Sequence, residues 1–112
     1  MRDFAWRSGR AEVELPVEVA TDQGAFTAAC KNIGAGGAFV ATDQLPAVGT
    51  RLALKLRLPQ QDRPMSLGAE VRWTRPGDPT VSAPGSAGMG LRFVNLPVGA
   101  LIAIHELLLA GE

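Results

Sequence analysis

Apolar and polar residues alternate with a period of two along much of this chain. In residues 51–58 leucine occupies every second position, and Arg51, Lys55 and Arg57 lie between the leucines. Residues 13–19 repeat the pattern, with apolar side chains at the odd positions. Successive side chains of a β-strand point to opposite faces, so this alternation predicts strands with one face in a core and the other in solvent.

Turn-forming residues separate the alternating segments from one another. The predicted strands cover residues 13–19, 26–32, 38–42, 51–58, 67–73 and 90–94. No helical pattern lies between them, which favours an all-β fold, a six-stranded antiparallel β-barrel. Residues 74–88, rich in Pro, Gly, Ser and Ala, are expected to form a mobile surface loop. The chain has 112 residues, 46% of them hydrophobic, which is enough for one core, and we expect a single domain over residues 1–112.

The C-terminal segment has the spacing of a helix. Pro97 is placed like a first helical residue and Gly111 like a C-terminal cap, so we expect an α-helix over residues 97–110. Its expected buried stripe comprises Leu101, Ile104 and Leu108. Further apolar residues extend around the helix, whereas a helix on a protein surface normally has polar residues on its solvent-facing side. The helix is therefore expected either to be deeply covered or to contact a protein partner, including a second copy of the chain.

The charge balance argues against several kinds of partner. Eleven Lys and Arg residues against eleven Asp and Glu residues give no net charge, so the field that attracts DNA, RNA or an anionic membrane is missing. The apolar stretch at residues 98–110 contains His105 and Glu106 and is too short to cross a bilayer. We expect no nucleic-acid partner and no membrane insertion. A single cysteine, Cys30, and a start unlike a secretion signal favour a cytoplasmic location.

Residues for catalysis or metal binding are scarce. The chain has one His, one Cys and no Tyr, which is too few for a zinc site built from those residues. Cys30 falls in an alternating strand and His105 in the apolar helix, so both have structural interpretations. Glu12, Glu14 and Glu18 share the solvent side of one strand, without the contrasting environments that an acid–base pair needs. We expect no metal, no cofactor and no enzymatic activity.

Three segments, in order, indicate a candidate binding site. Residues 1–10 form an arm ahead of the first strand and contain Arg7 and Arg10. Residues 32–37 read Asn-Ile-Gly-Ala-Gly-Gly, and glycine permits positive φ and close approach of a ligand, so we expect a tight loop there. Residues 88–93 read Gly-Met-Gly-Leu-Arg-Phe and lead into the last strand. Guanidinium groups bind anions, so the N-terminal segment is the place to look for a local anion site.

Together with Glu-Val-Arg-Trp at residues 70–73, these segments resemble the PilZ domain family. The resemblance implies a six-stranded barrel with a C-terminal helix and cyclic di-GMP as the ligand. The family signature is Arg-x-x-x-Arg before the first strand and a later Asp/Asn-x-Ser-x-x-Gly segment. Arg10 takes the place of the second arginine and would hold phosphate or guanine. Trp6 stands where the first arginine belongs and would either stack on guanine or pack against the barrel. Arg7, one residue away, would assist.

The second half of the signature is also partly kept. Asn32 and Gly37 match it, and Asn32 would read a guanine edge, whereas Gly34 stands where the family has serine. Gly36 and Gly37 would let the ligand approach the backbone. The ligand-binding residues that the resemblance implies are Trp6, Arg7, Arg10, Asn32, Gly34, Gly36 and Gly37.

Two functions follow, and the sequence leaves both open. In the first, cyclic di-GMP binds between the arm and residues 32–37, orders the arm and so changes a protein contact. The resemblance then implies second-messenger signalling in bacteria, for example in the control of motility. In the second, the chain is a protein-interaction module that ignores the nucleotide and uses the helix at residues 97–110. Trp6 and Gly34 at signature positions favour this alternative.

Overall fold

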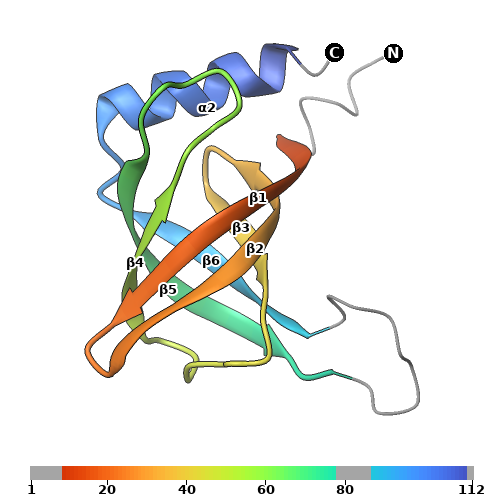
Figure 1. Ribbon diagram of the computed structural model, residues 1–112, viewed down its shortest axis with the longest axis vertical. Helices are drawn as coiled ribbons and strands as arrows, with labels where there is room; N and C mark the ends of the chain where they lie inside the picture. Colours follow the sequence, from red (N-terminus) through yellow and green to blue (C-terminus); the bar gives the residue numbers. More distant parts are fainter. Residues whose placement is uncertain (1–8, 78–86, 111–112) are drawn as a thin grey trace.

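The computed structural model describes residues 9–77 and 87–110, and within them six strands close into an antiparallel barrel with one helix (Figure 1). The strand order around the barrel is β1-β2-β3-β6-β5-β4. The elements are β1 (Arg10–Thr21), β2 (Gly24–Gly34), β3 (Gly37–Ala41), β4 (Arg51–Leu56), β5 (Met65–Arg75), β6 (Gly88–Val94) and α2 (Val98–Ala110). The predicted barrel and C-terminal helix are confirmed.

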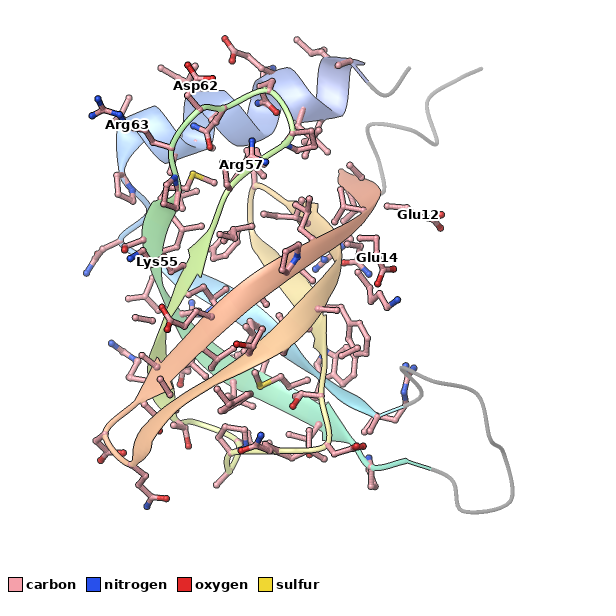
Figure 2. The ribbon with its side chains drawn as sticks, in the orientation of Figure 1. Glu12, Glu14, Lys55, Arg57, Asp62 and Arg63 are labelled. Atoms are coloured by element: carbon pink, nitrogen blue, oxygen red, sulfur yellow. The ribbon has the colours of Figure 1, made fainter. Side chains whose placement is uncertain are left out.

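The alternating pattern determines which side chains fill the barrel. On β4, Leu52, Leu54 and Leu56 are buried, and the residues between them are exposed. Leu58 is fully buried although β4 ends before it, so the predicted end of this strand at residue 58 was wrong while its inward position was right. Figure 2 shows Glu12 and Glu14 pointing away from the barrel, as the alternation on β1 requires.

Trp73 departs from the predicted alternation. In the predicted strand over residues 67–73, Trp73 alternates with Leu67, Ala69 and Val71 and should face the core with them, but 48% of it is exposed. The pairing of β5 with β6 shifts register between Val71 and Trp73. Such a bulge places an extra residue on one strand and re-aims the side chains that follow it. Val71 therefore stays inside the barrel, and the Trp73 indole lies on its outer face.

The expected glycine loop is shorter than predicted. Asn32 and Gly34 belong to β2 and Gly37 begins β3, so only residues 35–36 connect the two strands. Positive φ among the described glycines occurs at Gly9, Gly24 and Gly49, not in residues 32–37. The prediction of a conformationally special loop was wrong, and Gly34 and Gly37 serve close packing instead.

α2 lies across one open end of the barrel (Figure 1). Its buried residues are Ala100, Ala103 and Ile104, and the Gln60 amide donates a hydrogen bond to the Ala103 carbonyl at 2.7 Å. Leu101, which we expected in the buried stripe, is 42% exposed. The Pro97 carbonyl accepts a hydrogen bond from the Leu101 N–H at 2.9 Å, so Pro97 caps the helix rather than starting it.

The remaining predicted features are placed as follows. Residues 1–8, which include Trp6 and Arg7, lie outside the described residues, as do residues 78–86 of the predicted surface loop. Cys30 is buried, and burial raises the pKa of its thiol to about 11. His105 is exposed on α2. In the described ranges, neither a helix of membrane-spanning length and hydropathy nor a metal-binding cluster of His, Cys, Asp and Glu is found.

Candidate functional site

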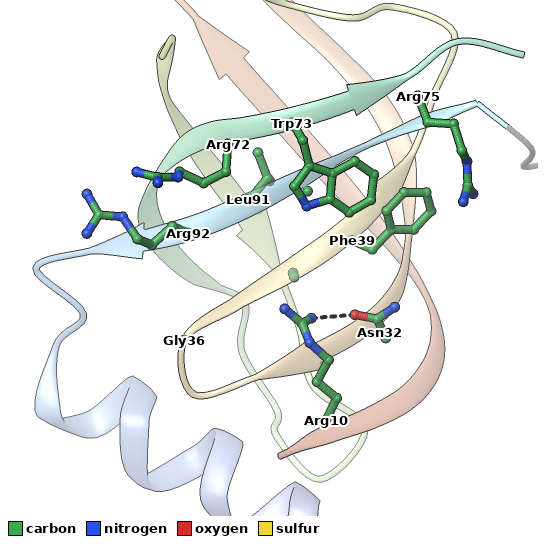
Figure 3. Close-up of a pocket in the computed structure, with 11 residues that line it drawn as sticks. Arg10, Asn32, Gly36, Phe39, Arg72, Trp73, Arg75, Leu91 and Arg92 are labelled. Atoms are coloured by element: carbon green, nitrogen blue, oxygen red, sulfur yellow. Dashed lines mark hydrogen bonds between the residues drawn. The ribbon is translucent and has the colours of Figure 1, made fainter. Parts of the chain in front are cut away.

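A pocket of about 600 Å³ opens on the outer face of β3, β6 and β5, beside the start of β1 (Figure 3). It is lined by Arg10, Asn32, Gly36, Ala38, Phe39, Arg72, Trp73, Arg75, Gly90, Leu91 and Arg92. The lining comes from strands that are far apart in the sequence but adjacent in the barrel. Its volume lies within the range of roughly 300–1,000 Å³ that is usual for ligand sites.

Arg10 and Asn32 form one wall of the pocket. The Arg10 Nη1 atom donates a hydrogen bond to the Asn32 Oδ1 atom at 2.5 Å. The pairing of β1 with β2 places Arg10 opposite Gly34, two residues from Asn32, so both side chains leave neighbouring strands on the same outer face. In Figure 3 both groups point toward the aromatic side chains across the pocket. The strands thus fix a guanidinium group next to an amide.

Gly34 allows the two strands to meet this closely. A β-carbon on Gly34 would overlap the carbonyl oxygen of Gly9 and lie 3.2 Å from the Cγ atom of Arg10. Gly37 has a similar role on the other side, because its β-carbon would overlap the carbonyl oxygen of Leu91. Both glycines are therefore required by backbone packing around the pocket.

Phe39 and Trp73 form a flat aromatic surface in the pocket. Their rings stack with centroids 5.5 Å apart and an angle of 21° between their planes. Gly90 pairs with Phe39 on one side and Trp73 on the other, and a β-carbon on Gly90 would overlap the indole. A β-carbon on Gly88 would likewise overlap the Phe39 ring. These two glycines of β6 therefore let the rings lie against the sheet.

The electrostatic character of the pocket is positive. Among the described residues that line it, the charged ones are Arg10, Arg72, Arg75 and Arg92. The Arg75 guanidinium lies 4.9 Å from the centroid of the Phe39 ring. Arg92 donates a hydrogen bond to Glu70 at 3.0 Å, and this bond holds the pKa of the Glu70 carboxyl below its usual range. Positive groups around stacked rings suit a ligand that combines anionic groups with a flat aromatic base.

The structure brings together part of the predicted site. Arg10, Asn32 and Gly36 line the pocket, whereas Gly34 and Gly37 shape the backbone around it. Trp6 and Arg7 lie outside the described residues. Phe39, Arg72, Trp73, Arg75 and Arg92 also line the pocket, and sequence reasoning assigned a ligand contact to none of them. The spacing of Gly88 and Gly90, two residues apart on a strand, was the available signal, because it leaves room on one face for neighbouring side chains.

Comparison with solved structures finds related folds at low sequence identity. The Bacillus subtilis inhibitor of motility MotI/DgrA matches with a TM-score of 0.72 and 24% identity over 90% of this chain and 48% of its own, so this chain spans about half of that protein. The PilZ domain of Escherichia coli YcgR with c-di-GMP matches with a TM-score of 0.70 and 11% identity, over 91% and 87%. The PilZ domain of CeSA from a cellulose-synthesizing bacterium has a TM-score of 0.62 and 17% identity, over 90% and 95%.

A comparison with the sequences of curated proteins finds no match. The family comparison is decisive instead, since the model of the PilZ domain matches residues 5–110, almost the whole chain. That match includes the second half of the arm, the glycine-bearing strands and the helix. The chain belongs to the PilZ domain family.

Proposed function

We propose that this domain is a non-enzymatic regulatory module that binds cyclic di-GMP in the pocket between the start of β1 and the Phe39–Trp73 stack. The observation that carries the proposal is the Arg10–Asn32 pair, which faces a pocket with stacked rings and further arginines. Membership of the PilZ family and the c-di-GMP complex of the related YcgR domain support the same ligand.

The chemistry of the ligand matches the pocket group by group. Cyclic di-GMP has two phosphates and two guanine bases. Guanidinium groups such as that of Arg10 bind phosphate oxygens or the O6/N7 edge of guanine. The Asn32 amide offers both a donor and an acceptor to a guanine edge. A guanine face can stack on Trp73, since base–aromatic stacking contributes about 1–3 kcal/mol per base.

The Phe39–Trp73 stack would compensate for the affinity that the incomplete signature costs. Loss of one charge-assisted hydrogen bond at the Trp6 position would cost about 1.5–3 kcal/mol, and loss of the serine hydroxyl at Gly34 about 1 kcal/mol. Stacking on Trp73 and cation contacts from Arg72 and Arg92 are of comparable size. We infer that contacts from β5 and β6 supply the binding free energy that the missing signature residues would otherwise contribute.

A second candidate function is protein interaction through α2, with or without the nucleotide. Val98, Ile102 and Leu109 are 72%, 53% and 58% exposed on the outer side of this helix. They follow one another at spacings of four and seven residues, so they share one helical face. We propose that this face contacts a protein partner or a second copy. Leu109→Glu would then abolish that contact and leave nucleotide binding unchanged.

Isothermal titration with cyclic di-GMP tests the main proposal. The wild-type domain should give saturable heat with cyclic di-GMP and none with GTP at equal concentration. Arg10→Ala should reduce the affinity by roughly tenfold or more, because a charge-assisted contact is lost. Arg63→Ala is the matched control, since Arg63 is exposed beside α2, away from the pocket (Figure 2). Absence of heat with the wild-type domain would rule out this ligand and leave the protein-interaction function.

A further inference from the structure

The first half of β2 has a neighbouring strand on one side only. β1 pairs with β2 along the whole of Gly24–Gly34, whereas β3 pairs with β2 only from Ala29 onward. β3 ends at Ala41, and the chain then turns along the end of the barrel toward β4 (Figure 1). Residues 24–28 of β2 therefore form a strand edge without a neighbour among the described residues.

The main-chain groups of Ala25 and Thr27 point out of this edge. Thr21 and Gly24 close a two-residue hairpin, and the closing pair of such a hairpin is hydrogen-bonded. Bonded and non-bonded pairs then alternate, so Ala25 and Thr27 direct their N–H and C=O groups away from β1. Ala29 uses the same side to pair with β3. Within the described part of the chain, no backbone hydrogen bond from a turn or loop reaches this edge.

This edge lacks the residues that usually protect one. Exposed edges in natural proteins tend to carry lysine, proline, inward-pointing charges or a bulge, which prevent another strand from adding. Residues 24–28 read Gly-Ala-Phe-Thr-Ala, without a charge or a proline. The register shifts on β2 lie farther along the strand, beyond Ala29. The edge is thus open to a further strand.

A groove of about 830 Å³ lies beside the edge, between the β1–β2 hairpin and the segment that follows β3. Phe26, Leu45 and Pro46 contribute apolar surface to it, and Gln23 and Gln44 contribute amides. Its described lining has no residue in common with the nucleotide pocket. In Figure 1 the hairpin lies at the end of the barrel opposite α2.

We propose that this edge and groove dock an extended peptide segment of another protein, which adds to the barrel as a strand beside β2. Ala25 and Thr27 would each donate a main-chain N–H hydrogen bond to the peptide and accept one at the C=O. These bonds would form on the side of β2 that β3 does not cover. The peptide residue opposite Phe26 faces the groove and is apolar. The groove carries both Asp22 and Arg51, so it does not select a charged peptide.

A second copy of β2 is a poorer occupant of the same edge. Its side chain at the central position would be Phe26, which packs against the core of its own barrel. That ring cannot also fill the groove of another molecule. A peptide in extended conformation has no such restriction, and its main chain supplies the donors and acceptors that the edge needs. The site therefore fits a strand from a different protein.

Selection of linear heptapeptides from a random phage-displayed library on the wild-type domain tests this proposal. Enriched peptides are then synthesised and titrated against Thr27→Pro, which removes an outward N–H, and against Thr27→Val, which keeps it. We expect the enriched peptides to carry an apolar residue between the two residues that hydrogen-bond to Ala25 and Thr27. They should bind Thr27→Val like the wild type and Thr27→Pro about tenfold more weakly. Arg10→Ala should bind them unchanged, which separates this site from the nucleotide pocket.

Two further measurements keep the test decisive if Thr27→Pro does not fold. The selected peptide with N-methyl groups at its paired positions should lose binding to the wild-type domain, because its own donors are removed. Amide chemical-shift changes on adding the unmodified peptide should centre on residues 24–28 and 44–47. The proposal is overturned if no peptide is enriched, if N-methylation leaves the affinity unchanged, or if the shifts centre elsewhere on the barrel.

Discussion

The carbonyl oxygen of Gly9 occupies the place where a side chain on Gly34 would begin. Gly9 has a φ of 56°, a left-handed conformation that glycine adopts without strain, and this turns its carbonyl toward β2. Arg10, the next residue, pairs with Gly34 and so reaches Asn32. The position of the pocket arginine therefore depends on a glycine at the point where the family signature has serine.

Replacement of Gly34 by the family residue is predicted to harm this domain. The serine β-carbon in Gly34→Ser overlaps main-chain atoms of Gly9, which can move only by shifting the start of β1. We expect a loss of about 1–3 kcal/mol in the free energy of unfolding, as for other insertions into packed sites. Affinity for cyclic di-GMP should fall as well, because Arg10 is displaced. Urea unfolding and titration calorimetry measure the two effects.

Gly36→Ser is the matched control for that change. It adds the same side chain two residues away, where nothing lies within 4 Å of the new β-carbon. Its free energy of unfolding should stay close to that of the wild type. If Gly34→Ser instead bound the nucleotide more tightly, the start of β1 would be able to shift without loss of affinity. The claim that the position of Arg10 depends on Gly34 would then be disproved.

The role of the aromatic stack can be tested through Gly90. In Gly90→Ala the new β-carbon overlaps the Trp73 indole, a half-exposed side chain that can swing away from the sheet. We expect a folded domain with weakened nucleotide binding, because stacking contributes about 1–3 kcal/mol. In a Trp6→Phe background Trp73 is the sole tryptophan, so its fluorescence reports the movement directly.

Gly68→Ala provides the comparison on the neighbouring strand. Its β-carbon would lie 3.4 Å from the carbonyl oxygen of Val94, an ordinary contact, and Gly68 does not line the pocket. Fluorescence and affinity should match those of the wild type. Equal losses of affinity in Gly90→Ala and Gly68→Ala would assign the effect to the sheet rather than to Trp73.

Much of the barrel was predictable from period-two alternation alone. The inward positions on β4, such as Leu54, follow directly from it, because one strand face must fill the core. The alternation does not show which strands pair with one another or in which register they pair. The shift between Val71 and Trp73 depends on where β6 lies against β5, and it places a tryptophan in the pocket on the outer face instead of the expected core.

The site was predictable only where it coincides with the family signature. Arg10 and Asn32 could be named because the motif carries them, and the structure brings them into contact. Phe39 comes from β3 and Trp73 and Arg75 from β5, which lie on either side of β6, so no local pattern marks the phenylalanine as a neighbour of the other two. The glycines were noticed in the sequence, but their requirement arises from backbone contacts with Gly9 and other distant residues.

Cys30 is predicted to be unreactive in the folded domain. Burial raises the pKa of its thiol to about 11, so little thiolate forms near neutral pH and reagents cannot reach it. Labelling with a thiol-specific disulfide reagent at pH 8 should be slow and should accelerate in denaturant. Because the folded pKa is raised, stability should fall as the pH rises from about 9 to 11, and Cys30→Ala should remove this part of the fall. Rapid labelling of the native protein would contradict the assignment.

The two faces of α2 should respond differently to truncation. Ile104 is fully buried against the barrel, so Ile104→Ala should lower the free energy of unfolding by about 2–5 kcal/mol. Leu109 is 58% exposed, and Leu109→Ala should change it by less than about 0.5 kcal/mol. Urea unfolding of both variants at low protein concentration makes the comparison. If Leu109→Ala proved as costly as Ile104→Ala, that side chain would be covered in the free domain. The outer face of α2 would then be part of the core and unavailable to a partner.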